Sequence, residues 1–215
     1  MEMMTTILLI RHGETQWNRS GIFRGSCDVP LNDVGRRQAR LLGQRLACRQ
    51  IDAAYTSALS RASETAQLAL GDRDIEARAD GRFVDFSYGH WQGLAEAEVA
   101  RRWPEELAAW KSKPHTLRVP GGDTLGEVYD RAFEGMEELA ARHGGGSIAL
   151  FAHRVVNKLL VLGALGLGLD RFGFIRQDNG CFNEFQRGAG GYVIVCLSDT
   201  SHLRQTGVDP LSDDF

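Results

Sequence analysis

The sequence predicts a three-layer α/β/α sandwich around a mainly parallel sheet, with an antiparallel hairpin at one edge. Apolar, β-branched strand patterns alternate with amphipathic helical patterns along most of the chain. Near the end, two strand patterns are joined by the short turn GAGG, which is typical of a hairpin. With 215 residues and 43% hydrophobic content, the chain can bury a large core, and we expect a single domain spanning residues 1–215.

The expected strands are runs of six or seven residues, most of them rich in apolar side chains, that end at polar or glycine-rich segments. The first and fourth runs are almost wholly apolar, which is typical of strands buried on both faces of a sheet. The last two runs form the hairpin. In chain order, the six runs are TTILLI (5–10), IDAAYTS (51–57), DIEARAD (74–80), SIALFA (147–152), CFNEFQR (181–187) and YVIVCLS (192–198).

The expected helices begin at capping residues and carry one apolar face. The first is capped by Asn32 or Asp33 and extends to about Cys48. Its apolar positions, spaced for one face, are Ala39, Leu42, Leu46 and Ala47. The second begins near Ala58, so Arg61 lies in its first turns.

Three further helical segments follow in the second half of the chain. Residues 94–111 are helical in character and are interrupted near Pro104. A long helix is expected from Thr124 to about His143, and the glycines at 144–146 end it. The last segment, VVNKLLVLGAL (155–165), directly follows the strand SIALFA.

Reactive polar residues stand where the strands end. Arg11 and His12 close the first strand, His153 and Arg154 close the fourth, and Arg61 follows the second. The carboxyl ends of parallel strands share one edge of a sheet, where ligands of open α/β folds bind. Convergence of these groups is an inference here, because spacing alone does not show which strands are neighbours. Arginine matches phosphate or carboxylate oxygens, and histidine attacks or moves protons near neutral pH, so the pattern indicates anion chemistry.

Composition and charge exclude several classes of function. A formal charge of −3 gives no basic field, which disfavours nucleic acid as a partner. The apolar runs at the start and at 159–169 are too short for a secretion signal or a membrane span, so we expect a cytoplasmic protein without membrane contact. The four cysteines show no CxxC or Cys/His cluster, which indicates reduced thiols and no zinc site. The sequence leaves open whether the protein forms a homodimer.

Several motifs resemble those of the histidine phosphatase superfamily, which includes cofactor-dependent phosphoglycerate mutases and many phosphomonoesterases. The ending LSDTSHL is similar to that of phosphatase members such as α-ribazole phosphatases and broad-specificity phosphatases. The matching blocks occur in the family's order along nearly the whole chain. They are RHGETQWN (11–18), FRGSCDVPLNDVGRRQA (23–39), TSALSRASETA (56–66), VDFSYGHWQG (84–93), PGGDT (120–124) and FAHRVVNK (151–158).

The resemblance implies roles for the residues at the matching positions. His12 would attack phosphorus and form a phosphohistidine, while His153 and the arginines hold the phosphoryl oxygens. Asn18 would help to hold the phosphate. These groups provide fixed positive charge without a metal or another cofactor. The phosphate-binding set is Arg11, Arg61, Asn18 and His153, and the substrate-binding set is Arg24, Gly25 and Arg154.

His12 must keep a lone pair on one ring nitrogen if it is the nucleophile. We therefore expect its other nitrogen to donate a hydrogen bond to a backbone carbonyl or a similar acceptor, which fixes the tautomer. The family also implies that residues 85–122 form loops and short helices over the active site.

The proton donor is expected at Asp85, four residues before Gly89, where the family usually has glutamate. The shorter acid can protonate the leaving oxygen and then deprotonate water. The alternative is that Asp85 only caps its loop. Arg154 is a second departure, because the family commonly has glycine there. It either recognises a second anionic group of the substrate or points into solvent, and the sequence leaves both open.

The other aromatic and imidazole side chains are expected to serve the structure. For the remaining histidines, a surface position is the simpler interpretation. For the tryptophans, packing of the short helical segment is the simpler interpretation, and the alternative is that they wall the pocket. These residues are His90, His115, His143 and His202, and Trp91, Trp103 and Trp110.

Three functions compete: a phosphomonoesterase for a small phosphorylated metabolite, a phosphoglycerate mutase, and a phospho-ligand binding module without turnover. The mutases carry an extra basic segment between the acidic loop and the Pro-Gly-Gly loop, and the interval here, which includes RRWPEELAAWKSKPHTLRV (101–119), is short. The residues implied in catalysis are all present, which disfavours a binding module. We therefore predict metal-independent hydrolysis.

Overall fold

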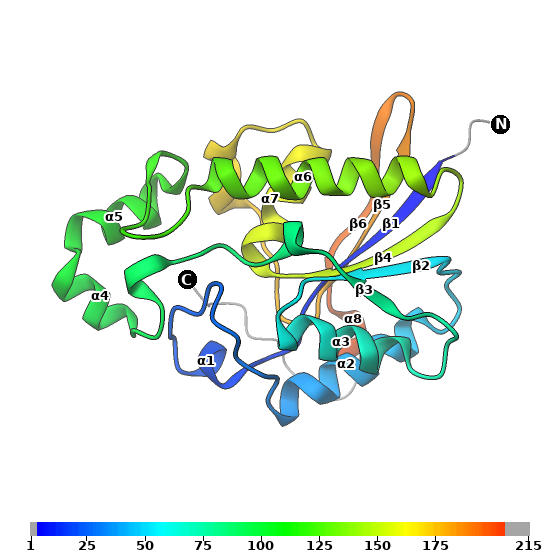
Figure 1. The fold of residues 1–215 in the computed structure, drawn as a ribbon, viewed down its shortest axis with the longest axis horizontal. Coiled ribbons are helices and arrows are strands. Elements are labelled where there is room, and N and C mark those ends of the chain that lie inside the picture. The colour runs from blue at the N-terminus through cyan, green and yellow to red at the C-terminus, as the bar shows by residue number, and fades with distance from the viewer. Residues whose placement is uncertain (1–3, 205–215) are drawn as a thin grey trace.

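A computed structural model describes residues 4–204 of the chain. Its centre is one six-stranded sheet with the order β3-β2-β4-β1-β5-β6 (Figure 1). The pairs β3-β2, β2-β4 and β4-β1 are parallel, whereas β5 is antiparallel to both β1 and β6. The strands are β1 (Thr5–Arg11), β2 (Ala53–Thr56), β3 (Ala77–Ala79), β4 (Ser147–Ala152), β5 (Phe182–Gly188) and β6 (Gly191–Asp199).

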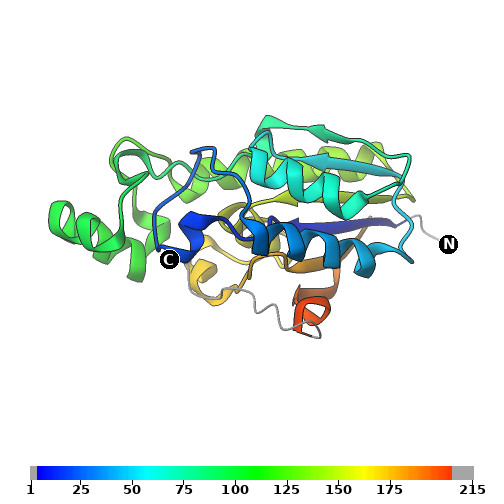
Figure 2. The same cartoon turned by 90° about the horizontal axis from the view of Figure 1, so that it is seen from below.

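Helices cover both faces of the sheet. The long helix α6 (Leu125–Arg142) and α7 (Arg154–Ala164) lie on one face, and α2 (Asp33–Leu46) and α3 (Ser60–Leu70) lie on the other (Figures 1 and 2). The short C-terminal helix α8 (Ser201–Arg204) packs against α2. The predicted three-layer sandwich with an edge hairpin is therefore confirmed.

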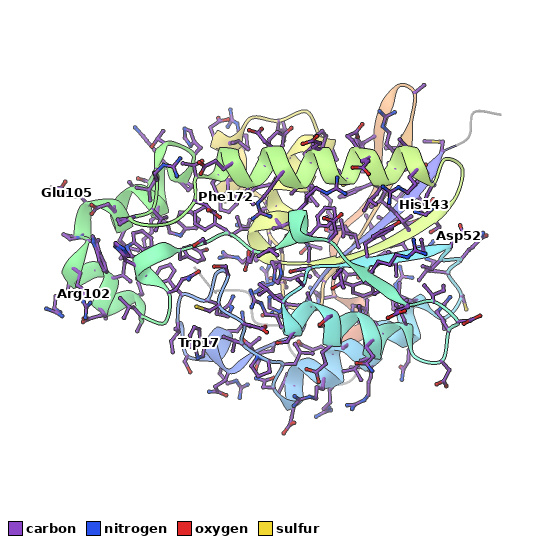
Figure 3. The ribbon with its side chains drawn as sticks, in the orientation of Figure 1. Trp17, Asp52, Arg102, Glu105, His143 and Phe172 are labelled. Atoms are coloured by element: carbon purple, nitrogen blue, oxygen red, sulfur yellow. The ribbon has the colours of Figure 1, made fainter. Side chains whose placement is uncertain are left out.

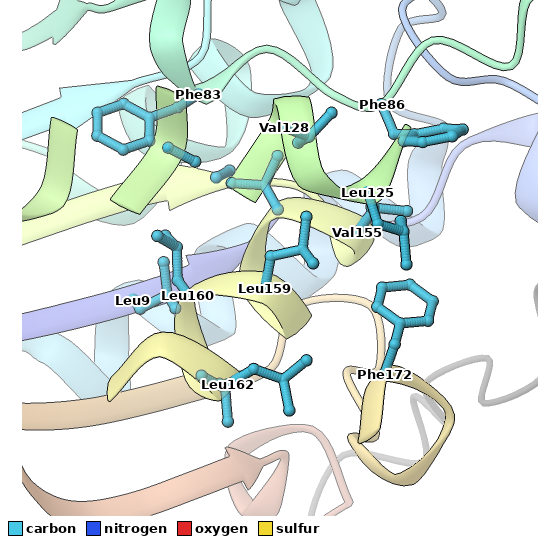
Figure 4. Close-up of a cluster of buried hydrophobic side chains, with 14 of the residues drawn as sticks. Leu9, Phe83, Phe86, Leu125, Val128, Val155, Leu159, Leu160, Leu162 and Phe172 are labelled. Atoms are coloured by element: carbon cyan, nitrogen blue, oxygen red, sulfur yellow. The ribbon is translucent and has the colours of Figure 1, made fainter. Parts of the chain in front are cut away.

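The alternation of side chains along the strands creates the two cores. Ile7 and Leu9 of β1 belong to the cluster under α6 and α7, whereas Leu8 and Ile10 belong to the cluster under α2 and α3. Because successive strand residues point to opposite faces, a strand buried on both sides needs a continuous apolar run, and β1 has one. Figure 4 shows part of the first cluster, with Leu9 near Leu160 of α7.

Side-chain caps fix where two of the helices begin. Asn32 accepts a hydrogen bond from the backbone nitrogen of Gly35 at 2.8 Å, as the sequence predicted for the start of α2. Thr124 and Glu127 form a reciprocal capping box at the start of α6. Such caps satisfy backbone donors that have no partner inside the helix, and each stabilises it by about 1 kcal/mol.

Short helices extend from the carboxyl edge of the parallel strands (Figure 1). Pro104 is the first residue of α5, where its missing backbone N–H costs no hydrogen bond, so the predicted interruption separates two helices. The elements of this region and of the adjoining loops are α1 (Gln16–Arg19), η1 (Gly81–Phe83), η2 (Gly89–Trp91), α4 (Glu96–Arg102), α5 (Pro104–Ser112), η3 (Pro114–Thr116) and η4 (Leu169–Phe174), of which the η elements are 3-10 helices.

Several details differ from the sequence predictions. Strands β2 and β3 are shorter than the runs 51–57 and 74–80, because only residues 53–56 and 77–79 pair with neighbouring strands. Ala47 lies beyond the last residue of α2 and is exposed, so it does not share the apolar face of that helix. Helix α1 was not expected, because Thr15 caps only a single turn.

Other predictions lie partly outside the described residues. Residues 1–3 and 205–215, which the single-domain prediction includes, are not described. Within residues 4–204, no helix is both long and apolar enough to cross a membrane. All four cysteines of the chain have free thiols in the structure.

Candidate active site

Two buried histidines lie side by side at the carboxyl edge of the sheet. Strands β1 and β4 are adjacent and parallel, and the register pairs Arg11 with Ala152. His12 and His153 directly follow the two strands, and the backbone nitrogen of His12 donates to the carbonyl oxygen of Ala152 at 3.1 Å. The centroids of the two imidazole rings are 5.2 Å apart, and both side chains are 0% exposed. The sheet order therefore brings together two residues that are far apart in the sequence.

The tautomer of His12 is determined by one short contact. Its Nδ1 lies 2.6 Å from the carbonyl oxygen of Gly13. A carbonyl oxygen only accepts, so Nδ1 carries the proton and Nε2 keeps its lone pair. Nε2 is buried and has no hydrogen-bond partner in the described part of the chain. Burial, and then the neighbouring arginine charges with Arg61 first, lowers the pKa of His12 well below its usual value, so the ring is neutral near pH 7.

Arg61 is held by backbone carbonyls and by one carboxylate. Its Nη1 donates to the carbonyl oxygen of Cys27 at 2.7 Å, and its Nη2 donates to that of Gly25 at 2.6 Å. The same Nη2 lies 3.3 Å from Oδ2 of Asp85. Burial lowers the pKa of Arg61 to about 10, which still leaves it charged at neutral pH. Strand β2 lies next to β4, so the start of α3 brings this charge to the two histidines.

Gly25 is at a position where only glycine fits. Its φ is +53°, and a Cβ would lie 2.5 Å from Oε1 of Gln92 and 2.6 Å from the carbonyl oxygen of Phe86. The sequence assigned this residue to substrate binding. In the structure, its carbonyl orients Arg61, so a contact with substrate stays a prediction.

Two further arginines add positive charge to the site. Nη1 of Arg11 donates to the carbonyl oxygen of Gln177 at 2.6 Å. The amide of Gln177 is in turn hydrogen-bonded to Asn183, at 2.8 Å, in a buried network that the sequence analysis did not identify. Arg24 is 8% exposed, and its charge, like that of Arg11, contributes to the lowered pKa of His12.

Asp85 uses its two oxygens differently. Oδ1 accepts a hydrogen bond from the backbone nitrogen of Phe86 at 2.9 Å, which is the loop-cap role. Oδ2 is directed to the charged groups, 3.3 Å from Arg61 Nη2 and 3.8 Å from His153 Nδ1. Burial raises the pKa of Asp85, and the charge of Arg61 opposes the rise. Asp85 is therefore positioned for both roles considered from the sequence, that of loop cap and that of proton donor. Its raised pKa favours the protonated form.

Asn18 and Arg154 are the two remaining residues that were expected to contact the phosphate or the substrate. Oδ1 of Asn18 accepts from the backbone nitrogen of Thr15 at 2.9 Å and completes a capping box for α1. Arg154 is the first residue of α7 and is half-buried. It lines the same small cavity as Asp85 and Arg24, so it does not simply point into solvent. The roles of both residues toward substrate stay predictions.

The cavity beside Asp85 is small. It measures about 10 Å³, which is room for about one water molecule. Segments from 22–25, 85–88 and 154–155 line it.

The remaining histidines lie outside this cluster. His90 and His115 are exposed, as expected, whereas His202 is half-buried. His143 is also half-buried, and its Nε2 lies 2.8 Å from the hydroxyl of Tyr55. Figure 3 shows His143 and Asp52 at the end of the sheet opposite α4 and α5.

The tryptophans mainly pack, as the sequence predicted. Trp91 and Trp110 are buried in the larger core, and Trp103 is partly buried against it. Among residues 4–204, no group of three or more His, Cys, Asp or Glu side chains could hold a metal ion.

A family model for the histidine phosphatase superfamily (branch 1) matches residues 7–200. The chain belongs to this superfamily. The family predicted from the motifs is therefore confirmed, and so is the enzyme class, phosphoric monoester hydrolase.

Relatives within the superfamily include both phosphatases and mutases. The chain is 30% identical over 206 residues to "Phosphoserine phosphatase 1" of Hydrogenobacter thermophilus, covering 96% of this chain and 98% of the relative. It is 32% identical to a "2,3-bisphosphoglycerate-dependent phosphoglycerate mutase" of Mesorhizobium japonicum, covering 70% of this chain and 77% of the relative. Among solved structures, Bacillus stearothermophilus YhfR is similar with a TM-score of 0.89 and 31% identity, covering 92% and 98% of the two chains.

Proposed function

We propose that this histidine phosphatase hydrolyses a small phosphorylated metabolite through a phosphohistidine at His12, without a metal ion. The contact of Nδ1 with the Gly13 carbonyl carries the proposal, because it leaves the Nε2 lone pair as the reactive one. The lowered pKa keeps that lone pair unprotonated at neutral pH. A buried neutral imidazole surrounded by arginines is suited to attack a phosphate dianion.

In the first half-reaction, the Nε2–P bond forms as the ester P–O bond breaks. Asp85 in its protonated form donates its proton to the leaving oxygen. Phosphoryl transfer needs little further covalent help, since fixed positive charge around the equatorial oxygens stabilises the transition state. We assign that charge to Arg11 and Arg61, with His153, Asn18 and Arg24 as further phosphate or substrate contacts.

In the second half-reaction, water attacks phosphorus, and the Asp85 carboxylate accepts its proton. The P–N bond breaks, and its electron pair returns to Nε2 of His12. Because the same carboxyl group acts first as acid and then as base, its loss is expected to slow both steps.

A phosphoglycerate mutase is the second candidate, since a mutase is among the relatives at comparable identity. A mutase must retain the bisphosphate intermediate long enough for it to reorient in the site. Between Asp85 and Thr124 this chain has only short helices, of which the longest, α5, has nine residues. We infer that water resolves the phosphoenzyme.

The product formed from 3-phosphoglycerate tests this choice. Inorganic phosphate supports the phosphatase, 2-phosphoglycerate supports the mutase, and the absence of any product from a panel of phosphomonoesters would overturn both. Coupled enzymatic assays for each product make the measurement. Cytoplasmic location, homodimeric assembly and the single domain also stay predictions.

Chelator treatment is expected to leave the activity unchanged. The arginine charges at His12 provide what a cation would otherwise supply to the phosphate, and they repel a cation. Phosphate release should be measured after dialysis against EDTA, with and without added Mg²⁺, Mn²⁺ or Zn²⁺. A loss that one of these metals restores would contradict the metal-independent mechanism.

The pH dependence of the first half-reaction should show a loss of rate as Asp85 loses its proton with rising pH. Burial raises its pKa, so the protonated acid is present below that raised pKa and is lost as pH rises through it. His12 has a lowered pKa, so no acidic loss centred near 6.5 should come from its protonation. We therefore compare single-turnover rates with an alkyl phosphate. The rate of wild type divided by the rate of Asp85→Asn is expected to fall as pH rises.

This ratio cancels the ionisation of the substrate itself, which both enzymes share. Rapid-quench measurements at a series of pH values give the rates. A ratio that stays constant or rises with pH would show that the proton of Asp85 is not used in the first step.

A further inference from the structure

The peptide group between Gly13 and Glu14 determines which ring nitrogen of His12 carries the proton. Its carbonyl oxygen, that of Gly13, accepts from Nδ1 of His12. Its N–H, that of Glu14, is at the opposite end of the same peptide group. If this group turned over, a donor would replace the acceptor near Nδ1. The ring proton would then reside on Nε2, and the reactive lone pair would be lost.

Glycine makes such a rotation easy at this position, because it has no Cβ to restrict the backbone. Close packing requires glycine here, since a Cβ on Gly13 would lie 2.5 Å from the carbonyl oxygen of Gly35 in α2. The residue that lets α2 approach the nucleophile therefore also leaves the next peptide group easy to rotate. The orientation of that group depends on contacts from elsewhere in the fold.

Asn179 holds the oxygen end of this peptide group. Its Nδ2 donates to the carbonyl oxygens of His12 and Gly13, each at 3.3 Å. Both oxygens only accept, so the amide nitrogen must face them. Asn179 is 0% exposed, and its Oδ1 has no hydrogen-bond partner among residues 4–204. A buried oxygen without a partner is destabilising, which favours a role for this amide beyond stability.

A tight turn places Asn179 against the nucleophile. The backbone nitrogen of Cys181 donates to the carbonyl oxygen of Asp178 at 3.0 Å, and Gly180 has a φ of +69°. These features are those of a β-turn in which glycine takes the left-handed position. The backbone nitrogen of Gly180 also donates to the carbonyl oxygen of His12 at 3.1 Å. The turn is thus anchored at the end of β1, where Asn179 reaches one residue further.

Gln38 of α2 holds the nitrogen end of the same peptide group. Its Oε1 accepts from the backbone nitrogen of Glu14 at 2.8 Å. Gln38 is also 0% exposed. If the peptide group turned over, its carbonyl would face the Gln38 oxygen, and its N–H would face Nδ2 of Asn179. Two acceptors and two donors would then oppose each other, so both amides disfavour the rotated state.

We propose that Asn179 and Gln38 are positioning residues for the nucleophile. They hold the peptide group between Gly13 and Glu14 with its carbonyl toward Nδ1 of His12, and so keep the lone pair on Nε2. The effect on rate rests on the proposed phosphatase function. The tautomer does not, because it is a property of the free protein.

The tautomer of His12 can be measured directly by nuclear magnetic resonance. The ring is neutral near pH 7, so spectra at that pH report tautomers and not the imidazolium. In ¹⁵N-labelled protein, two-bond couplings between ring protons and ring nitrogens show which nitrogen is protonated, and comparison with His12→Ala identifies the signals. We expect the Nδ1–H tautomer to dominate in wild type.

Asn179→Leu removes both donated bonds and keeps a side chain of similar size. We expect it to lower the Nδ1–H fraction of His12 by about 10-fold, as for other hydrogen-bond partners that orient a functional imidazole. Gln38→Met should shift the tautomer in the same direction from the opposite end of the peptide group. The single-turnover rate of phosphoenzyme formation at saturating substrate should fall in proportion, with KM little changed, because the phosphate-binding arginines are intact.

Asp178→Asn is the matched control. Asp178 belongs to the same turn, but its carboxylate faces Arg176, whose Nε lies 2.9 Å from Oδ1. This variant should keep the wild-type tautomer and rate, and an equal shift in it would assign the effect to the turn and overturn the proposal. Thermal unfolding establishes that each variant is folded. If Asn179→Leu does not fold, Asn179→Ala makes the same test.

The two readouts separate this inference from the proposed function. An unchanged tautomer in folded Asn179→Leu or Gln38→Met would overturn the inference, even if the rate falls. A shifted tautomer supports it even if no phosphate ester is hydrolysed. A shifted tautomer with an unchanged single-turnover rate would leave the positioning role intact and would contradict attack by Nε2 of His12.

Discussion

Replacing His12 with alanine is expected to lower kcat by about 10⁴-fold or more and to abolish the phosphoenzyme, because the attacking atom is lost. In the structure, Nε2 is the nitrogen of His12 that keeps a lone pair, since Nδ1 donates to Gly13. The neighbouring ring of His153 is also neutral and buried. Burial, and then the charge of Arg61, lowers the pKa of His153 well below its usual value. Steady-state phosphate release from several esters measures the loss.

The control for His12→Ala is a histidine away from the cavity. His115 is exposed in η3, and His115→Ala should retain the wild-type rate. Circular dichroism and thermal unfolding of both variants establish that each is folded. Hydrolysis by folded His12→Ala within tenfold of the wild-type rate would remove His12 from the role of nucleophile.

The loss of rate on replacing Asp85 with asparagine is expected to depend on the leaving group. An alkoxide is strongly basic and needs a proton as the P–O bond breaks, whereas para-nitrophenolate leaves without one. Oδ2 of Asp85 faces the charged groups of the site, and burial raises its pKa toward the protonated form. We expect phosphoenzyme formation from alkyl phosphates to slow by about 10²- to 10⁴-fold, and from para-nitrophenyl phosphate much less.

The phosphoenzyme of Asp85→Asn should also persist longer, because the base for water is lost. Asp80 offers a matched control, since it caps η1 in the same segment and bonds to Arg82. Asp80→Asn tests support of the loop without removing the acid. Equal slowing for both leaving groups, together with the same pattern in Asp80→Asn, would mean that Asp85 only supports its loop. Rapid-quench assays of both substrates provide these rates.

The polar residues at the strand ends could be predicted because each belongs to a local pattern. An apolar run that stops at Arg11 and His12, or at His153, identifies a buried strand and the groups at its end. Their proximity depends on the order β2-β4-β1, which is a property of long-range pairing. Local periodicity contains no information on that pairing, so convergence could be inferred only from the shared edge of a parallel sheet, and the resemblance to a family supported it.

The residues that orient the site could not be predicted from local sequence patterns, for the same reason. Gln177 orients Arg11 from a position 166 residues away, and nothing around Gln177 indicates such a contact. The carbonyl of Gly25 holds Arg61 because the left-handed turn at Gly25 directs it there. The division of the Asp85 oxygens between loop and site is likewise a matter of three-dimensional geometry. The sequence could name Asp85 but could not choose between its two roles.

The central claim is that the phosphoryl group is carried by His12, and mapping that group is the most direct test. The enzyme is mixed with excess para-nitrophenyl phosphate, quenched in alkali, where phosphohistidine survives, and digested for mass spectrometry. We predict one acid-labile phosphoryl group on the peptide that contains His12, and none in His12→Ala. A phosphoryl group on His153 or another residue, or turnover without any phosphoenzyme in either wild type or Asp85→Asn, would contradict it.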